Sequence, residues 1–199
     1  MVFAAAETVN VAIISPAVIY GVSPSIEHPL PLTLPELMNA IKSTSSGWTI
    51  KEGKNISGYI HVMDMARLYV LLVSHALAPS SSVQDSEVWG PRAYYFGSSE
   101  ELSFFEYMTS IVKVLKERNF IQTDEIRQID VKQAAQATGA SITAQPVDSW
   151  VHHIVLLFGC NTRVRSTRAY SLGWKPEGPG VKDTLEEVIN MYLESVEKI

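Results

Sequence analysis

Residues 11–21 have the sequence VAIISPAVIYG. The stretch begins with four apolar residues in a row, Val11, Ala12, Ile13 and Ile14, and Pro16 and Gly21 interrupt it on the carboxyl side. An unbroken apolar run of this length predicts a strand that is buried on both faces, as in a parallel sheet. Such a strand needs parallel neighbours beside it and helices above and below it.

The composition is that of a chain able to bury a hydrophobic core. The chain has 199 residues, of which 46% are hydrophobic and 19% charged, and a chain of this length corresponds to about one domain. Sixteen basic and twenty-one acidic side chains give a net charge of −5 without a block of like charge. We therefore expect no nucleic-acid partner and no binding to an anionic membrane.

The cysteine content and the lengths of the apolar stretches indicate the cellular compartment of the protein. The single cysteine, Cys160, excludes an intrachain disulfide and a cysteine-based zinc site, and we predict no metal site. The longest apolar stretches, 11–20 and 68–78, are shorter than the ~20 residues of a membrane-spanning helix. Residues 1–10 also lack the basic start of a signal peptide. The predicted location is the cytoplasm.

Several helices are predicted after the apolar strand. Thr33 with Glu36, and Ser98 with Glu101, have the spacing of a capping box, and each pair precedes an apolar stripe of helical period. Asp64 is placed to cap a further helix that is apolar nearly all round. We expect these helices to pack on a sheet.

Too few strands are predicted for a complete sheet. Short strands are expected at 48–50, 58–62 and 93–96, and only the last of them is a second candidate for the core sheet. The chain therefore has the pattern expected for the later part of a longer βαβ series. An uncovered sheet edge is a template for pairing with another chain, so we also expect self-association.

Four segments, in this order, carry a resemblance to a known family. They are SPAVIYG at 15–21, YIHVMDMARLYVLL at 59–72, YYFGSSEELSFFE at 94–106 and LGWKP at 172–176. Together they resemble the C-terminal part of extended short-chain dehydrogenase/reductases, the NAD-dependent epimerase/dehydratase-like proteins. KEGKNISGYIHVMDMARLYVLL and GCNTRVR are similar to the fungal-type branch of that family.

The resemblance implies an α/β fold: a partial Rossmann-type fold that keeps its late parallel strands and carries a mostly helical substrate-binding subdomain. Residues 1–25 would form the end of the NAD(P)-binding Rossmann domain. Residues 26–199 would form the substrate-binding C-terminal region, with one residual Rossmann strand near 93–97. The implied function is substrate binding in a truncated NAD(P)-dependent oxidoreductase or epimerase that acts on a small hydroxyl or carbonyl compound. The implied cofactor is NAD or NADP.

Two motifs that the family uses for chemistry are missing. No GxGxxG or GxxGxxG occurs, although a glycine-rich turn is what lets the backbone approach a pyrophosphate. None of the eight tyrosines is followed by lysine four residues later, so the proton-transferring Tyr-x-x-x-Lys pair is absent. We expect no catalytic residue and weak or no cofactor binding in this chain. The alternative function is a catalytically silent ligand-binding or regulatory module of the same family.

The matched segments contain the candidate binding residues. Pro16, Ala17 and Val18 match positions whose backbone lines the nicotinamide end of the cofactor, and the alternative is an ordinary turn at the end of a strand. Tyr20 faces the substrate or packs in the core. Ser57 stands where sugar-nucleotide members often place an arginine, which argues against a nucleotide-diphosphate substrate.

Two arginines complete the predicted substrate site. Arg163 and Arg165 lie in an expected loop after Gly159, and their forked guanidinium groups are suited to a carboxylate or a phosphate. The alternative is a solvated or salt-bridged turn. With a small-molecule substrate as the expected partner, the predicted substrate-binding residues are Tyr20, Ser57, Arg163 and Arg165.

Overall fold

The structure, a computed structural model, describes residues 10–78, 88–138 and 155–197. Its strands are β1 (Ile13–Pro16), β2 (Val18–Tyr20), β3 (Gly47–Ile50), β4 (Ile56–His61), β5 (Tyr94–Gly97), β6 (Glu100–Ser103) and β7 (Ile126–Ile129). Its α-helices are α2 (Leu34–Thr44), α3 (Val62–Leu77), α5 (Phe104–Glu117), α6 (Val131–Ala137), α8 (Thr167–Ser171) and α9 (Val181–Glu197), and a π-helical turn spans Val155–Gly159. Among the described helices, none has the length and apolar content needed to cross a membrane.

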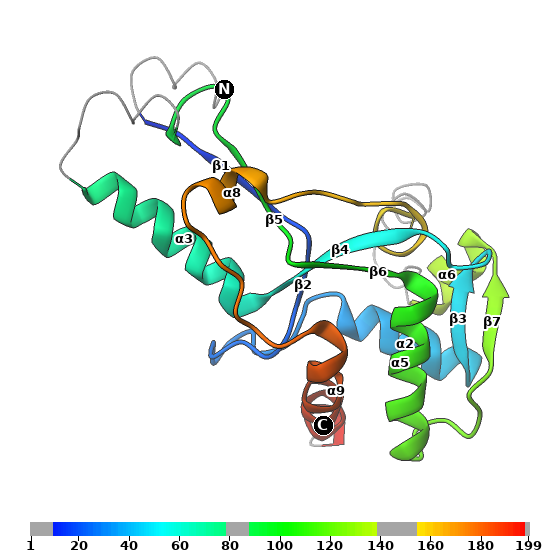
Figure 1. Cartoon of the computed structure of the whole chain (residues 1–199). Helices are drawn as coiled ribbons and strands as arrows, with labels where there is room; N and C mark the ends of the chain where they lie inside the picture. Colours follow the sequence, from blue (N-terminus) through cyan, green and yellow to red (C-terminus); the bar gives the residue numbers. More distant parts are fainter. Residues whose placement is uncertain (1–9, 79–87, 139–154, 198–199) are drawn as a thin grey trace.

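The described strands form three small sheets. β1 pairs with β5 and β3 pairs with β7, both in parallel, while β4 lies between its parallel partner β2 and its antiparallel partner β6. Parallel strands that alternate with helices confirm the predicted α/β class. α3, β1, β5 and α8 form one end of the molecule, and α2, α5, β3 and β7 form the other (Figure 1).

The apolar stretch 11–21 folds as two strands. β1 pairs with β5 and β2 pairs with β4, and the chain changes partner at Ala17, whose amide donates to the carbonyl of Gly97 at 2.8 Å. The prediction of a central strand buried on both faces is wrong, because β1 is only partly buried and has a strand neighbour on one side among the described residues. Its predicted partner at 93–96 is confirmed as β5.

The cap of α5 lies five residues after its predicted position. Ser103 and Glu106 form the reciprocal capping box, in which each side chain accepts from the other residue's backbone amide. The predicted box of Ser98 and Glu101 is therefore wrong. The two pairs have the same spacing in the sequence. Residues Glu100–Ser103, however, pair with β4 as strand β6, so strand pairing overrides the local helix signal of Ser98 and Glu101.

The larger core lies between α2, α5 and α9. Trp48 of β3 is fully buried in it, with its ring 5.2 Å from that of Phe104 and 5.3 Å from that of Phe158. Rings in tilted or edge-to-face contact of this kind bury a large apolar area and stabilise the core. This core therefore packs β3 against α2, α5 and α9.

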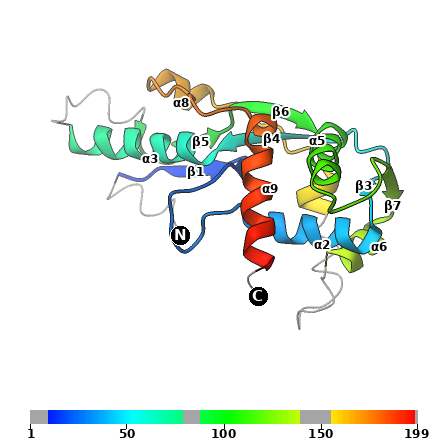
Figure 2. The same ribbon diagram turned by 90° about the horizontal axis from the view of Figure 1, so that it is seen from below.

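A second core lies between α3 and the β1–β5 pair, along which α3 runs (Figure 2). The inner face of α3 buries Met65 and Leu68 against Tyr95 and Gly97. A Cβ atom on Gly97 would lie 2.8 Å from Met65 Sδ, so the glycine allows the helix to approach the strand closely.

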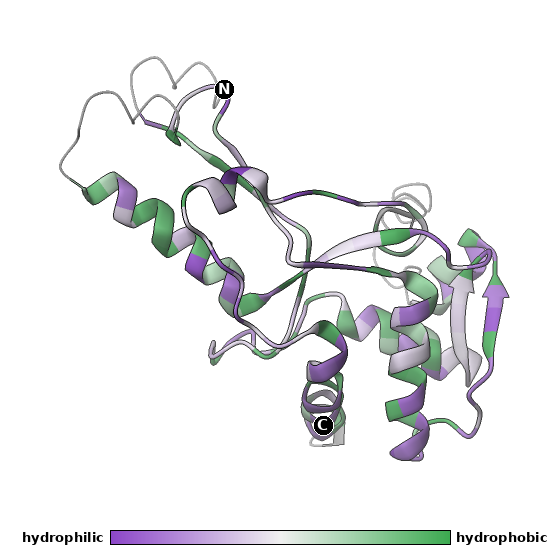
Figure 3. Cartoon of the chain, viewed as in Figure 1, coloured by the Kyte–Doolittle hydropathy of each residue, from purple (hydrophilic) through white to green (hydrophobic). Residues whose placement is uncertain are grey.

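The outer face of α3 is also apolar, but it is exposed. Apolar residues extend along the whole helix (Figure 3). On the outer face the side chains of Val70, Val73 and Leu77 are 64%, 55% and 81% exposed. Apolar side chains that follow one another on one helix face favour association with another surface.

We predict that the variant Val70→Lys/Val73→Lys stays monomeric at concentrations where the unmodified chain self-associates. Two lysines on this face oppose its burial, and unfolding free energy should change by less than about 1 kcal/mol because both side chains are exposed. Light scattering measures association and urea unfolding measures stability. Thr109→Lys/Gln136→Lys places the same charge on other exposed positions and is the control. A monodisperse unmodified chain with one cooperative unfolding transition would contradict the expected association.

Candidate functional site

A cleft of about 770 Å³ opens at the carboxyl end of β1. Residues of the segments 15–21, 28–33 and 161–164 supply most of its lining, and Ser23, Val62 at the start of α3 and Leu157 complete it. In α/β proteins, ligands bind outside the carboxyl ends of parallel strands. The volume is also within the range of about 300–1,000 Å³ that small-molecule sites occupy. The cleft is therefore the candidate functional site.

The cleft brings together predicted residues that are far apart in the sequence. Pro16, Ala17 and Val18 line it from the turn between β1 and β2, and Arg163 lines it from the opposite segment. The segment that carries Arg163 is held by backbone pairing with β4: the amide of Gly58 donates to the Thr162 carbonyl at 3.0 Å. Three parts of the chain thus converge on one cavity.

Ser57 and Arg165 do not line the cleft. Ser57 is 4% exposed inside β4, where it forms an isolated parallel bridge with Thr162. Ser57 is therefore paired with the segment that carries Arg163 and does not face the cleft. Arg165 is exposed, and its charge acts on Glu101, whose pKa it helps to lower.

Tyr20 is buried and lies outside the lining. Its hydroxyl is 2.6 Å from Glu100 Oε1 and 2.9 Å from the Pro179 carbonyl oxygen, both of which can accept its proton. Burial, and then the Glu100 carboxylate, raise the pKa of Tyr20 far above its ordinary value. The phenol therefore stays protonated and links β2 to the segment before α9.

Arg163 forms an ion pair at the edge of the cleft. Its Nε lies 3.1 Å from both carboxylate oxygens of Glu101, and its Nη2 lies 2.6 Å from Oε2. The pairing lowers the pKa of the Glu101 carboxyl and raises the pKa of the guanidinium. Arg163 is thus both a lining residue and a salt-bridged one.

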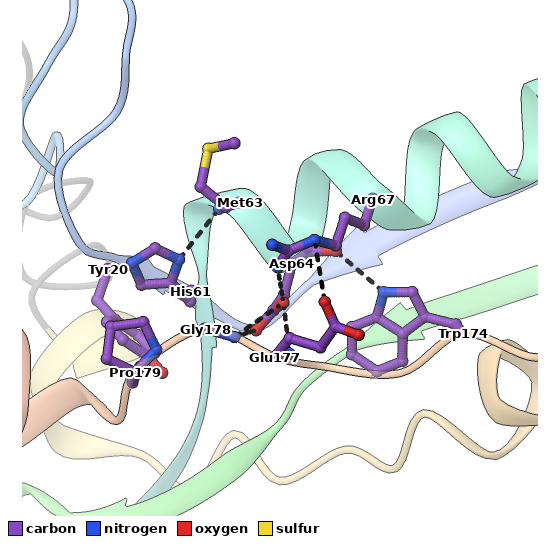
Figure 4. Close-up of polar contacts among 9 residues, drawn as sticks. All are labelled: Tyr20, His61, Met63, Asp64, Arg67, Trp174, Glu177, Gly178 and Pro179. Atoms are coloured by element: carbon purple, nitrogen blue, oxygen red, sulfur yellow. Dashed lines mark hydrogen bonds and ion pairs between the residues drawn. The ribbon is translucent and has the colours of Figure 1, made fainter.

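A buried imidazole lies directly behind the cleft wall. Gly21 lines the cleft with a φ of +87°, and a Cβ atom there would lie 2.5 Å from Nε2 of His61. His61 caps α3, because its Nδ1 accepts from the amide of Met63 at 3.2 Å (Figure 4). Burial lowers the pKa of His61, which favours the neutral form that this acceptor role requires. The predicted cap, Asp64, is therefore wrong.

The carboxylate of Asp64 instead ties the C-terminal segment to α3. It is 1% exposed and accepts from the backbone amides of Glu177 at 2.8 Å and Gly178 at 3.0 Å, and from Arg67 Nη1 at 2.6 Å (Figure 4). Its backbone carbonyl accepts from Trp174 Nε1 at 3.0 Å. Sequence reasoning missed this role, although one acidic residue in a helix that is apolar nearly all round was a signal for it.

The chain is similar in sequence to a known protein. No family model matches the chain. Over 194 residues it is 25% identical to the protein named Oxidase ucsJ of Acremonium sp., covering 96% of this chain and 52% of that protein. The chain therefore spans about half the length of the curated relative that it matches.

Solved structures resemble the chain over nearly all of its length. RMD from Pseudomonas aeruginosa, complexed with NADPH, is 14% identical, with a TM-score of 0.54 over 98% of this chain and 52% of that one. DesIV, a dTDP-glucose 4,6-dehydratase from Streptomyces venezuelae with NAD and TYD bound, is 17% identical, with a TM-score of 0.53 over 97% and 47%. UDP-N-acetylglucosamine 4-epimerase from Methanobrevibacter ruminantium M1 is 13% identical, with a TM-score of 0.55 over 96% and 49%. The fold is therefore that of roughly half of a Rossmann-type epimerase/dehydratase chain, which confirms the predicted partial Rossmann-type fold.

We predict that Asp64→Ala lowers the free energy of unfolding by about 3 kcal/mol or more, because it leaves two backbone amides and a guanidinium without their buried acceptor. Arg67→Gln is the matched control and should lower it by less, since the Asp64 carboxylate keeps the backbone amides of Glu177 and Gly178 and the Arg67 side chain is 45% exposed. Urea unfolding in the Val70→Lys/Val73→Lys background measures both. Equal losses in the two variants would show that the backbone contacts of Asp64 contribute little.

We predict that acidification destabilises the chain through His61. Its folded pKa is lowered, so the unfolded chain takes up the proton first. The neutral imidazole therefore contributes its full stability above about pH 6.5, the unperturbed pKa, and loses it as the pH falls through the lower folded pKa. His61→Asn keeps an N-cap acceptor but does not titrate. Urea unfolding from pH 8 to pH 5 should show a smaller loss of stability in His61→Asn than in the chain with His61. If the free energy of unfolding has the same pH dependence in both, His61 does not contribute.

Proposed function

We propose that this chain is the substrate-binding portion of an NAD(P)-dependent oxidoreductase or epimerase that acts on a small hydroxyl or carbonyl compound. The cleft at the carboxyl end of β1 is the observation that carries the proposal, because it joins Pro16, Ala17 and Val18 with the segment of Arg163. The likeness in fold to chains with NADPH or NAD bound supports it, and so does the 25% identity to a fungal oxidase.

The described residues fit the ring end of a nicotinamide cofactor. Pro16, Ala17 and Val18 would hold the ring, and a bound nicotinamide supplies or accepts a hydride. The amide of Ala17 is occupied by Gly97, so the ring would meet mainly apolar side chains there. Ile19 and Leu157, which also line the cleft, would exclude water from the reacting atoms.

The pyrophosphate end of the cofactor has no matching residues in this sequence. No glycine-rich phosphate turn and no Tyr-x-x-x-Lys pair occur in the 199 residues. We propose that the groups for pyrophosphate binding and proton transfer come from polypeptide outside these residues. The same missing motifs favour the second candidate, a catalytically silent ligand-binding or regulatory module of this fold.

We predict that NADH binds this chain only through its nicotinamide end, with a Kd weaker than about 1 mM, equivalent to ~4 kcal/mol of binding. Saturation-transfer NMR should therefore show transfer to the nicotinamide protons and little to the adenine protons. Pro16→Asp places a carboxylate at an exposed position of the cleft and should abolish the transfer.

The control is Ile26→Asp, an equally drastic change at an exposed position that does not line the cleft. It should leave the nicotinamide signal unchanged. No transfer to the nicotinamide protons would favour the silent module. A micromolar Kd with equal transfer to the adenine would mean that the chain holds the whole cofactor by itself.

A further inference from the structure

The lining of the cleft is mainly apolar, and each of its three segments contributes apolar side chains. Two of these side chains are exposed to solvent in the cleft: Ile19 at 37% and Leu32 at 81%. A ligand that covers them removes apolar surface from water, which stabilises the complex. The apolar lining side chains from the three segments include Val18, Ile19, Leu30, Leu32 and Val164, and Leu157 adds one from outside them.

The fixed charge in this lining is already neutralised. Among the described lining residues, Arg163 alone carries a fixed charge, and the other basic side chain is the imidazole of His28. The Nε and Nη2 atoms of Arg163 both contact the Glu101 carboxylate within 3.1 Å. A phosphate in this cleft would have to displace Glu101 or remain close to it. Arg165 is exposed and outside the lining, so it does not offer a second guanidinium inside the cleft.

The helix N-termini that reach the cleft offer few amides to an anion. α2 begins beside the lining residue Thr33, but the amide of Leu34 donates to the Pro31 carbonyl at 3.1 Å, and Pro35 has no N–H. At the start of α3, the amide of Met63 donates to His61. Phosphate sites at helix N-termini depend on amides of this kind, and here these have other partners.

Neutral polar groups remain in the lining. Ser15 and Thr33 supply hydroxyl groups to the lining, and Asn161, in the segment that carries Arg163, supplies a side-chain amide. The Asn161 Oδ1 atom accepts from the amide of Ile56 at 2.7 Å, which fixes the side chain in place. Such groups suit hydrogen bonds to a hydroxyl or carbonyl oxygen of an otherwise apolar molecule.

We infer that the cleft binds an uncharged, largely apolar hydroxyl or carbonyl compound and discriminates against ligands that carry a phosphate. The Glu101 carboxylate, by occupying Arg163, is the specificity determinant. This inference rests on the proposed function, because it names the substrate class of the same site.

A matched pair of probes tests the inference on the intact chain. 2-Naphthol and 2-naphthyl phosphate share one apolar body and differ in the phosphate. Fluorescence titration should give an affinity for 2-naphthol at least about tenfold higher, which corresponds to ~1.4 kcal/mol. Equal or tighter binding of the phosphate, or no binding of 2-naphthol, would overturn the inference.

Three variants test which residues determine the preference for 2-naphthol over its phosphate. Leu32→Asp introduces a charge into the lining and should weaken 2-naphthol binding about tenfold, whereas Ile26→Asp, at an exposed position outside the lining, should not change it. Glu101→Gln releases Arg163 and should strengthen binding of the phosphate about tenfold. An unchanged phosphate affinity in Glu101→Gln would show that Glu101 is not the determinant.

These outcomes are distinct from those for the proposed function. The preference for 2-naphthol over its phosphate does not involve a nicotinamide. If the preference holds while NADH gives no nicotinamide signal, only the cofactor role is lost. If the nicotinamide signal holds while the phosphate probe binds better, only the inferred substrate class is lost.

Discussion

The buried carboxylate of Asp64 joins parts of the chain that are far apart in the sequence. From the first turn of α3 it accepts the amides of Glu177 and Gly178, and so fixes the segment that leads into α9. Gly178 is needed at this contact, because a Cβ atom there would lie 2.7 Å from His61 and 2.9 Å from the Asp64 carboxylate. The side chain of Tyr20 reaches the same segment at Pro179. Asp64 and Tyr20 therefore hold the segment before α9 against α3 and β2.

The cleft itself results from a change of strand partner. At Ala17 the chain leaves β5 and joins β4, so the turn between β1 and β2 is open to a ligand on one side. β4 also carries the segment of Arg163 through its pairing with Thr162. One strand thus positions two walls of the cavity. The charge of Arg163 in the cavity lining is neutralised separately, by Glu101 on β6, which is the other neighbour of β4.

The exposure of the outer face of α3 has the same cause as the side of β1 that has no strand neighbour among the described residues: the topology of the β1–β5 pair. α3 covers the β1–β5 pair with its inner face and exposes Val70, Val73 and Leu77 on the other. The solved chains that share this fold are about twice as long. An apolar helix of this kind suits a layered α/β fold in which it contacts neighbours on two sides.

The sequence by itself determined the α/β class, the strand at β5 and the apolar segment at 11–21, because these features depend on local periodicity and on apolar runs. It placed Pro16 among the candidate binding residues through the resemblance, and Arg163 through its forked guanidinium in an expected loop. Only the tertiary structure decided that 11–21 splits between two sheets and that the cap of α5 is Ser103, since pairing with β4 competes with a helix that has an equally good local signal. It also decided that Arg163 meets Glu101 and that Tyr20 faces away from the cleft. Contacts of this kind join residues that are distant along the chain, and no local pattern encodes which partner a strand or a charge will meet.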